Sequence, residues 1–155
     1  MMLGLFIFEP IIVLIHELGH AFFNFIFGGK TKKIVIRKGK RLFSIGILEI
    51  RRWYFYSGQC SVKSPENDSK PLTIIMLLGG VLFQLFTGII LVLLVKLGII
   101  EYGNWLDVFL NFSLFMAVSA IIPVTYPDNT NSDGKQIYQI IKYGTSWYYD
   151  GKEEL

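Results

Sequence analysis

Three long apolar stretches dominate the pattern of hydrophobic and polar positions. They cover residues 2–27, 72–95 and 108–127. About 20 apolar residues in a helix cross the roughly 30 Å of hydrocarbon in a bilayer, so each stretch predicts a transmembrane helix. The second and third stretches contain no Asp, Glu, Lys, Arg or His, whereas the first carries Glu9 and a short His/Glu cluster.

The segments between and after these stretches predict smaller elements. Residues 31–62 are rich in β-branched and aromatic side chains, which indicates a small antiparallel sheet or hairpin with a turn at Lys38-Gly39-Lys40. Residues 133–142 place apolar side chains on one helical face and predict a short C-terminal helix. The fold class is therefore integral membrane α-helical, with three transmembrane helices, a small sheet between the first and second, and a short final helix. We expect residues 1–155 to form a single membrane-embedded domain.

Composition supports a membrane protein. The chain is 52% hydrophobic and only 17% charged, with a mean hydropathy of +0.47. Soluble domains carry about 25% charged residues, so an ordinary soluble domain is excluded. A single cysteine, Cys60, excludes an internal disulfide framework and any CxxC metal or redox motif.

The uneven distribution of charge predicts an orientation. Residues 28–70 hold eleven Lys/Arg and three Asp/Glu, a net charge of +8, which leaves −5 for the rest of the chain. Lys and Arg concentrate in cytoplasmic loops, so we expect this segment, with its sheet, and the C-terminus to be cytoplasmic and the N-terminus outside, in the cell membrane. The basic run between two spans favours contact with anionic lipid head groups, and no nucleic-acid partner is expected.

The two histidines of the chain form one motif, His16-Glu17-Leu18-Gly19-His20. Residues four apart lie on one face of a helix, so both imidazoles can reach one metal ion. In a zinc hydrolase with this spacing, the ion activates a water molecule and the Glu acts as general base. The motif predicts one Zn²⁺ per chain, with His16 and His20 as ligands and Glu17 as the base. The alternatives are a polar cavity or proton path without metal, or hydrogen bonds between packed helices.

A catalytic zinc site requires a third protein ligand. The motif lies in the half of the first span that precedes the basic segment, so Glu101 and Asp107, beyond the other end of the second span, are too far away. Asp128 and Asp133 both follow the near end of the third span and both remain candidates. Position favours Asp133, because Gly134 permits a close backbone approach, although Asp133 could instead cap the C-terminal helix.

These elements together resemble the site-2 protease family of intramembrane zinc metalloproteases. The first matched element is HELGH (residues 16–20) inside the first span, and the second is Ile122-Pro123 followed by Ser132-Asp133-Gly134. The third is residues 80–84 (GVLFQ), similar to a Gly-x-x-x-Asn element of the middle span. The resemblance implies that Asp133 is the third zinc ligand. Gln84 stands where the family has Asn and is a candidate for binding the substrate or the developing oxyanion.

The resemblance also implies the activity of a zinc metalloendopeptidase. Such an enzyme hydrolyses peptide bonds in or near transmembrane segments of membrane-bound substrates, so the expected partner is a transmembrane protein or hydrophobic peptide. It further implies that the sheet receives the substrate as an added strand, with Ile34–Arg37 and Phe43–Ile50 as candidate edges. The other interpretation of these strands is a lipid-facing cover.

Two other functions fit a small protein with three spans. One is a non-enzymatic membrane protein, such as an immunity or regulatory factor, that binds a hydrophobic peptide and retains a vestigial metal site. The intact general base Glu17 argues against that function. The other is a metal or proton transporter, which predicts ionisable groups in several spans, whereas the second and third spans have none.

Overall fold

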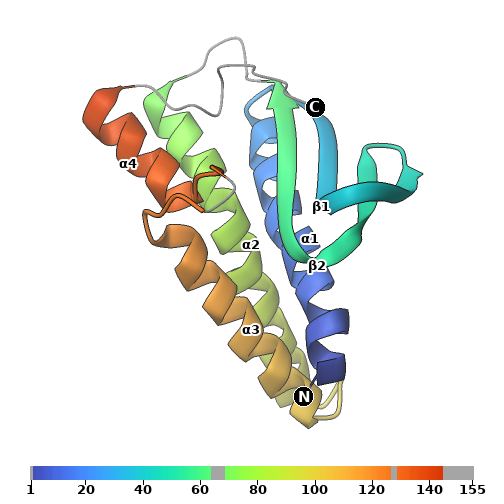
Figure 1. Ribbon diagram of the computed structural model, residues 1–155. Helices are drawn as coiled ribbons and strands as arrows, with labels where there is room; N and C mark the ends of the chain where they lie inside the picture. The colour runs from blue at the N-terminus through green and yellow to red at the C-terminus, as the bar shows by residue number, and fades with distance from the viewer. Residues whose placement is uncertain (1, 64–68, 127–128, 145–155) are drawn as a thin grey trace.

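The structure is a computed structural model that describes residues 2–63, 69–126 and 129–144. Within these residues, three long helices lie side by side (Figure 1): α1 (Met2–Ile26), α2 (Lys70–Lys96) and α3 (Asn104–Ile121). Each is long and apolar enough to cross a membrane. The prediction of three helices that could span a membrane is confirmed. Apolar side chains from all three form the buried interior, among them Ile12, Met76, Leu77 and Leu106.

The third helix ends earlier than its apolar stretch predicts. The sequence predicts a span to residue 127, but α3 ends at Ile121 and Ile122 has an extended backbone, with φ −63° and ψ 127°. The residue before a proline is disfavoured in the helical region, and Pro123 follows Ile122. The chain then turns through a bridge between Thr125 and Asn131 and enters α4 (Asp133–Tyr143). The predicted short C-terminal helix is therefore confirmed.

Between α1 and α2 the chain forms two strands, β1 (Lys30–Ile45) and β2 (Leu48–Lys63), which pair antiparallel. The predicted turn at residues 38–40 is wrong, because the hairpin turns at Gly46-Ile47. Gly39 lies inside β1 with φ +94°, a conformation that glycine adopts at little cost and that permits a bend within the strand.

The pairing of the strands makes the sheet mixed. Residues 34–36 pair antiparallel with residues 58–60 on one side. On the other side they pair in parallel register with residues 48–50. The first predicted edge, Ile34–Arg37, is therefore wrong for Ile34–Ile36, which are paired on both sides. The second predicted edge, Phe43–Ile50, is wrong for Leu48–Ile50, which are also paired on both sides. Among the described residues, the segment 41–45 pairs only with the start of β2, so it is an outer edge.

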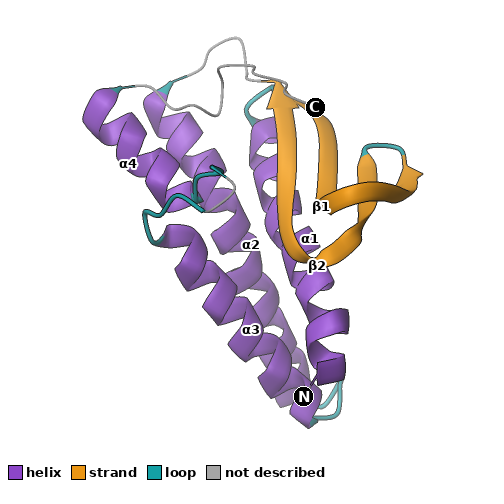
Figure 2. Cartoon of the chain, in the orientation of Figure 1, coloured by secondary structure: helices purple, strands orange, loops and turns teal. Residues whose placement is uncertain are grey.

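The sheet lies along α1, on the side away from α3 (Figure 2). Gly58 of β2 packs against the middle of the helix, where a Cβ atom would lie 2.6 Å from Val13 Cγ1. This part of the sheet is beside the centre of α1 rather than beyond its end. The far end of the hairpin projects away from the helices (Figure 1).

Candidate metal centre

The HELGH motif occupies the third quarter of α1, where this helix meets α2. The two helices approach closely at glycines: a Cβ on Gly19 would lie 2.2 Å from the carbonyl oxygen of Gly79. A Cβ on Gly80 would lie 2.5 Å from the His16 ring, so no larger residue fits beneath the imidazole. This contact buries His16 and His20 on the face of α1 that lies against α2.

Three potential ligand atoms converge at this contact. The Nε2 atoms of His16 and His20 are 3.1 Å apart. Asp133 Oδ2 lies 3.0 Å from His16 Nε2 and 3.5 Å from His20 Nε2. The structure thus brings together the two histidines of the motif and an aspartate more than a hundred residues away in sequence. Asp128, the other candidate, lies outside the described residues.

The other nitrogen of each imidazole is held by an oxygen atom of α2. His20 Nδ1 donates to the Met76 carbonyl oxygen at 2.8 Å, and His16 Nδ1 lies 3.3 Å from Gln84 Oε1. A carbonyl oxygen can only accept, so His20 Nδ1 carries a proton and Nε2 of the same ring faces Asp133. Metal-binding histidines are oriented by this kind of hydrogen bond. Three acceptor atoms directed at one another in a buried site favour a bound cation.

Asp133 reaches the histidines because α4 begins directly on the end of α3. A Cβ on Gly134 would lie 1.7 Å from the Ile121 carbonyl oxygen, so only glycine permits this approach. Ser132 Oγ donates to the Ile122 carbonyl oxygen at 2.7 Å and accepts from Lys135 N at 3.1 Å, which makes Ser132 the N-cap of α4. The alternative role of Asp133 as cap is wrong, and its carboxylate is available to the site.

The charge state of Asp133 fits a ligand. Burial alone would raise the pKa of this carboxyl, but the opposing effect of the His20 and His16 imidazoles is larger and holds the pKa well below its usual range. Asp133 is therefore an ionised carboxylate, the form that binds metal ions.

Glu17 points from α1 toward β2, and its side chain is buried. A Cβ on Gly58 would lie 2.4 Å from Glu17 Oε1, and the backbone N–H of Cys60 donates a hydrogen bond to the Glu17 carboxylate. Burial, and then the charge of Glu17, raise the pKa of the Cys60 thiol to about 12, so this thiol stays protonated and is no nucleophile.

Gly58 and the Cys60 backbone are contacts that the sequence analysis missed. A glycine inside a strand often marks a place where another group approaches the backbone closely, which is the one signal the sequence offered. The contact with the Met76 carbonyl could not be predicted from the sequence, because every residue type has a backbone carbonyl.

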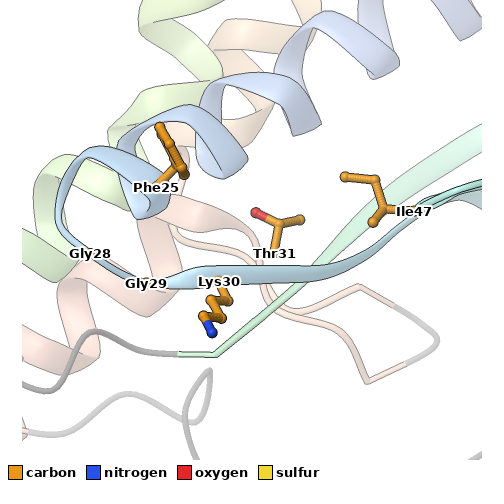
Figure 3. Close-up of a pocket in the computed structure, with 6 residues that line it drawn as sticks. All are labelled: Phe25, Gly28, Gly29, Lys30, Thr31 and Ile47. Atoms are coloured by element: carbon orange, nitrogen blue, oxygen red, sulfur yellow. The ribbon is translucent and has the colours of Figure 1, made fainter.

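One cavity among the described residues lies apart from this cluster. It has a volume of about 610 Å³ and lies where α1 ends and β1 begins (Figure 3). Its lining comprises Phe25, Gly28, Gly29, Lys30, Thr31 and Ile47. Only Lys30 and Thr31 bring polar side chains, and they form no set of ligands or acid–base groups. The candidate ligand atoms lie outside this cavity, in the cluster between α1, α2 and α4.

The chain is similar to known proteins. The chain matches the Peptidase M50B-like family over residues 4–126, a range that contains HELGH and ends before Asp133. It is 33% identical over 141 residues to a protein of Bacillus subtilis (strain 168) named uncharacterized membrane protein YwmF, and this match covers 91% of the chain and 88% of the relative. No solved structure matches the chain. The molecule is therefore a membrane protein that belongs to the Peptidase M50B-like family of site-2 proteases.

Proposed function

We propose that this protein is a zinc metalloendopeptidase that hydrolyses peptide bonds in or near transmembrane segments of membrane-bound substrates. The observation that carries the proposal is the convergence of His16, His20 and Asp133, with the Glu17 carboxylate held beside them. Placing ionisable side chains within a membrane costs free energy, and a bound divalent cation offsets that cost.

The distances among the three ligand atoms fit zinc. A tetrahedral site with Zn–N and Zn–O distances of about 2.0–2.1 Å has ligand atoms separated by about 3.3 Å. The separations here are 3.0, 3.1 and 3.5 Å. Two imidazoles and one carboxylate also form a donor set typical of catalytic zinc, with one position left for water. His16, His20 and Asp133 would therefore hold one Zn²⁺ per chain.

Zinc supplies Lewis-acid chemistry, which acidifies water and polarises a carbonyl group. In the proposed reaction, Glu17 accepts a proton from the attacking water and passes it to the leaving amine. Its buried carboxylate suits this role because the Cys60 N–H fixes it in position. Asp133 and the two histidines keep their lone pairs directed at one point, and the Met76 and Gln84 oxygens hold the rings in that orientation.

Gln84 has a second part in the proposal. Its Oε1 atom faces His16, while its Nε2 atom is buried and pairs with none of the described residues. An amide N–H with an unused hydrogen bond beside the metal ligands is suited to stabilise a developing oxyanion. We therefore assign Gln84 to substrate or oxyanion binding.

We further propose that an extended substrate pairs with the sheet before cleavage. The edge that remains for this mode is Phe43–Ile45, which pairs only with the start of β2 among the described residues. Residues 58–60 of β2 are not such an edge, because Gly58 packs against α1 and the Cys60 N–H is bonded to Glu17. The side chains of Leu42, Phe43 and Ile45 are exposed, which also fits the other interpretation of this segment as a lipid-facing cover.

The proposed orientation has the N-terminus outside and the basic segment 28–70 and the C-terminus on the cytoplasmic side, with the part of the sheet around Gly58 reaching along α1 into the membrane. Its support is the net charge of +8 on that segment. Labelling of single cysteines introduced at Lys30 and Gly98 in a Cys60→Ala background with an impermeant thiol reagent, in intact cells, tests it. Labelling at position 98 alone is the expected result, and labelling at position 30 alone would reverse the orientation.

Cleavage in vesicles tests the proposed activity. The purified protein would be reconstituted with a panel of synthetic transmembrane peptides, with and without zinc, and the products would be identified by mass spectrometry. Zinc-dependent cleavage within the apolar segment, absent in Glu17→Gln, supports a protease. Absence of cleavage across the panel by the zinc-loaded protein would favour a binding protein.

A further inference from the structure

A second cavity lies between α2 and α3 and begins next to the metal ligands. Its volume is about 350 Å³, and Gln84, Gly88, Leu110, Ser113 and Leu114 are among its lining residues. Binding pockets for small groups are apolar clefts of about 300–1,000 Å³ with a few placed polar groups, and this cavity fits that description. Gln84 is the polar residue that connects it to the site.

Gln84 has an unused hydrogen-bond donor at this position. The side chain is only 2% exposed, and its Oε1 lies 3.3 Å from His16 Nδ1. Its Nε2 is buried and has no partner among the described residues. A buried N–H without an acceptor costs free energy, so a ligand that supplies an acceptor binds more favourably.

The depth of the cavity in the bilayer indicates which kind of ligand can supply that acceptor. Gln84 is near the middle of α2 (Lys70–Lys96), so in a spanning helix it lies near the centre of the bilayer. Lipid acyl chains bring only hydrocarbon to this depth, because their ester oxygens stay at the interface. A peptide that crosses the bilayer brings a carbonyl oxygen at every residue.

The outer rim of the cavity is open to lipid. Leu85, Ile89 and Leu114 line it and are 47%, 58% and 57% exposed. On a membrane-spanning surface these side chains face hydrocarbon, so a group from a neighbouring transmembrane segment can enter sideways without passing through water.

We infer that this cavity is a pocket for an aliphatic side chain of the substrate, at a residue beside the bond to be cleaved. A backbone carbonyl of the same segment accepts a hydrogen bond from Gln84 Nε2. The inference rests on the proposed protease function and adds a preference to it: substrates carry a large apolar side chain at that position.

Adjacent residues of α3 provide a matched test. Leu114 lines the cavity, while Phe115 is 71% exposed and does not line it. In a Cys60→Ala background, which keeps the N–H that contacts Glu17, Leu114→Cys and Phe115→Cys each introduce one thiol. The probe is a synthetic peptide of about 20 leucines with one central cysteine activated as a thiopyridyl disulfide, in phosphatidylcholine vesicles. Mass spectrometry measures the rate of coupling, and circular dichroism checks that both variants are folded.

The expected result is coupling at least about tenfold faster at position 114 than at 115, with the ratio reduced by adding Gln84→Leu. Equal rates in folded variants would overturn the inference. Coupling does not require hydrolysis, so the two proposals fail separately. Preferential coupling at position 114 without cleavage would support the substrate pocket and contradict the protease function. Cleavage with equal coupling at the two positions would support the protease function and contradict the pocket.

Discussion

The contact between α1 and α2 and the end of the β-hairpin distribute polarity in opposite ways. At the helix contact, His16, His20 and Gln84 are buried, with exposures of 7%, 4% and 2%. At the hairpin end the apolar side chains are outside. These are Leu42, Phe43, Ile45 and Ile47, with exposures between 48% and 64%. A soluble domain would show the reverse of both.

The difference teaches where the structure is tightly constrained. At the helix contact, glycines at positions 19, 79 and 80 bring the backbones together, and the Nδ1 atoms of His16 and His20 are each held by an oxygen atom of α2. The hairpin end has no such close fit among the described residues, and lipid suits its exposed side chains. Substitutions at the contact should therefore affect the site strongly, and those at the hairpin end weakly.

The largest effect is expected for Glu17→Gln. The amide keeps the size of the side chain but cannot accept the proton, and a general base contributes about 10²–10⁴-fold to a rate. Cleavage of a transmembrane peptide in vesicles should fall by about that factor, while zinc content stays near wild type. Cleavage at the wild-type rate would remove Glu17 from the reaction.

A somewhat smaller effect is expected for Gly80→Ala. The added Cβ would lie 2.5 Å from the His16 ring, which has to move. Overpacking of this kind costs about 1–3 kcal/mol, and the displaced ring should weaken zinc binding as well. Thermal unfolding in detergent and zinc titration measure the two effects.

Gly88→Ala on the same helix is the control for Gly80→Ala. Its Cβ would lie 3.1 Å from the flexible end of the Leu110 side chain, which can yield. Equal losses in the two variants would mean that the close fit at the metal cluster has no special importance.

The next effect in size is expected for Gln84→Leu, which removes the acceptor for His16 Nδ1. Loss of such a supporting hydrogen bond typically lowers metal affinity or activity by about 10–100-fold. Competition with a zinc chelator measures the affinity. An affinity unchanged within twofold would show that Gln84 does not orient His16.

The smallest effect is expected at the hairpin end. Leu42→Ser with Ile45→Ser changes exposed side chains, and such changes usually alter stability by about 0.5 kcal/mol or less. Zinc affinity in detergent should stay within about twofold of wild type. A large loss of zinc would contradict the comparison, because it would show that the hairpin end supports the metal cluster.

Much of the fold was predictable because hydrophobic length is a strong signal. The apolar stretches predicted α1 and α2 to within about two residues, although α1 contains Pro10, which disfavours a helix interior. The predicted end of α3 was wrong because Pro123 disfavours a helical backbone at Ile122 alone, whereas hydropathy is averaged over many residues. The hairpin turn was wrong because Gly39 and Gly46 both have positive φ, and the sequence does not say which one bends a strand and which one reverses it.

The metal cluster was predictable in part for a similar reason. The spacing of His16 and His20 follows from the helical repeat, so two ligand candidates come from one motif. Position favoured Asp133 over Asp128 and the family resemblance implied it as a ligand, but nothing local in the sequence says that α4 starts on the end of α3. The backbone contacts from Met76 and Cys60 depend on tertiary packing alone, and no residue type announces them.

The central claim is the set of zinc ligands, and metal content tests it most directly. The protein would be purified in detergent without added metal, and zinc per chain measured by elemental analysis for wild type, Asp133→Ala and Asp128→Ala. We predict close to one zinc per chain in wild type and in Asp128→Ala, and a large loss in Asp133→Ala. A wild-type protein that holds no zinc even after reconstitution, or an Asp133→Ala variant that holds it fully, would contradict the account.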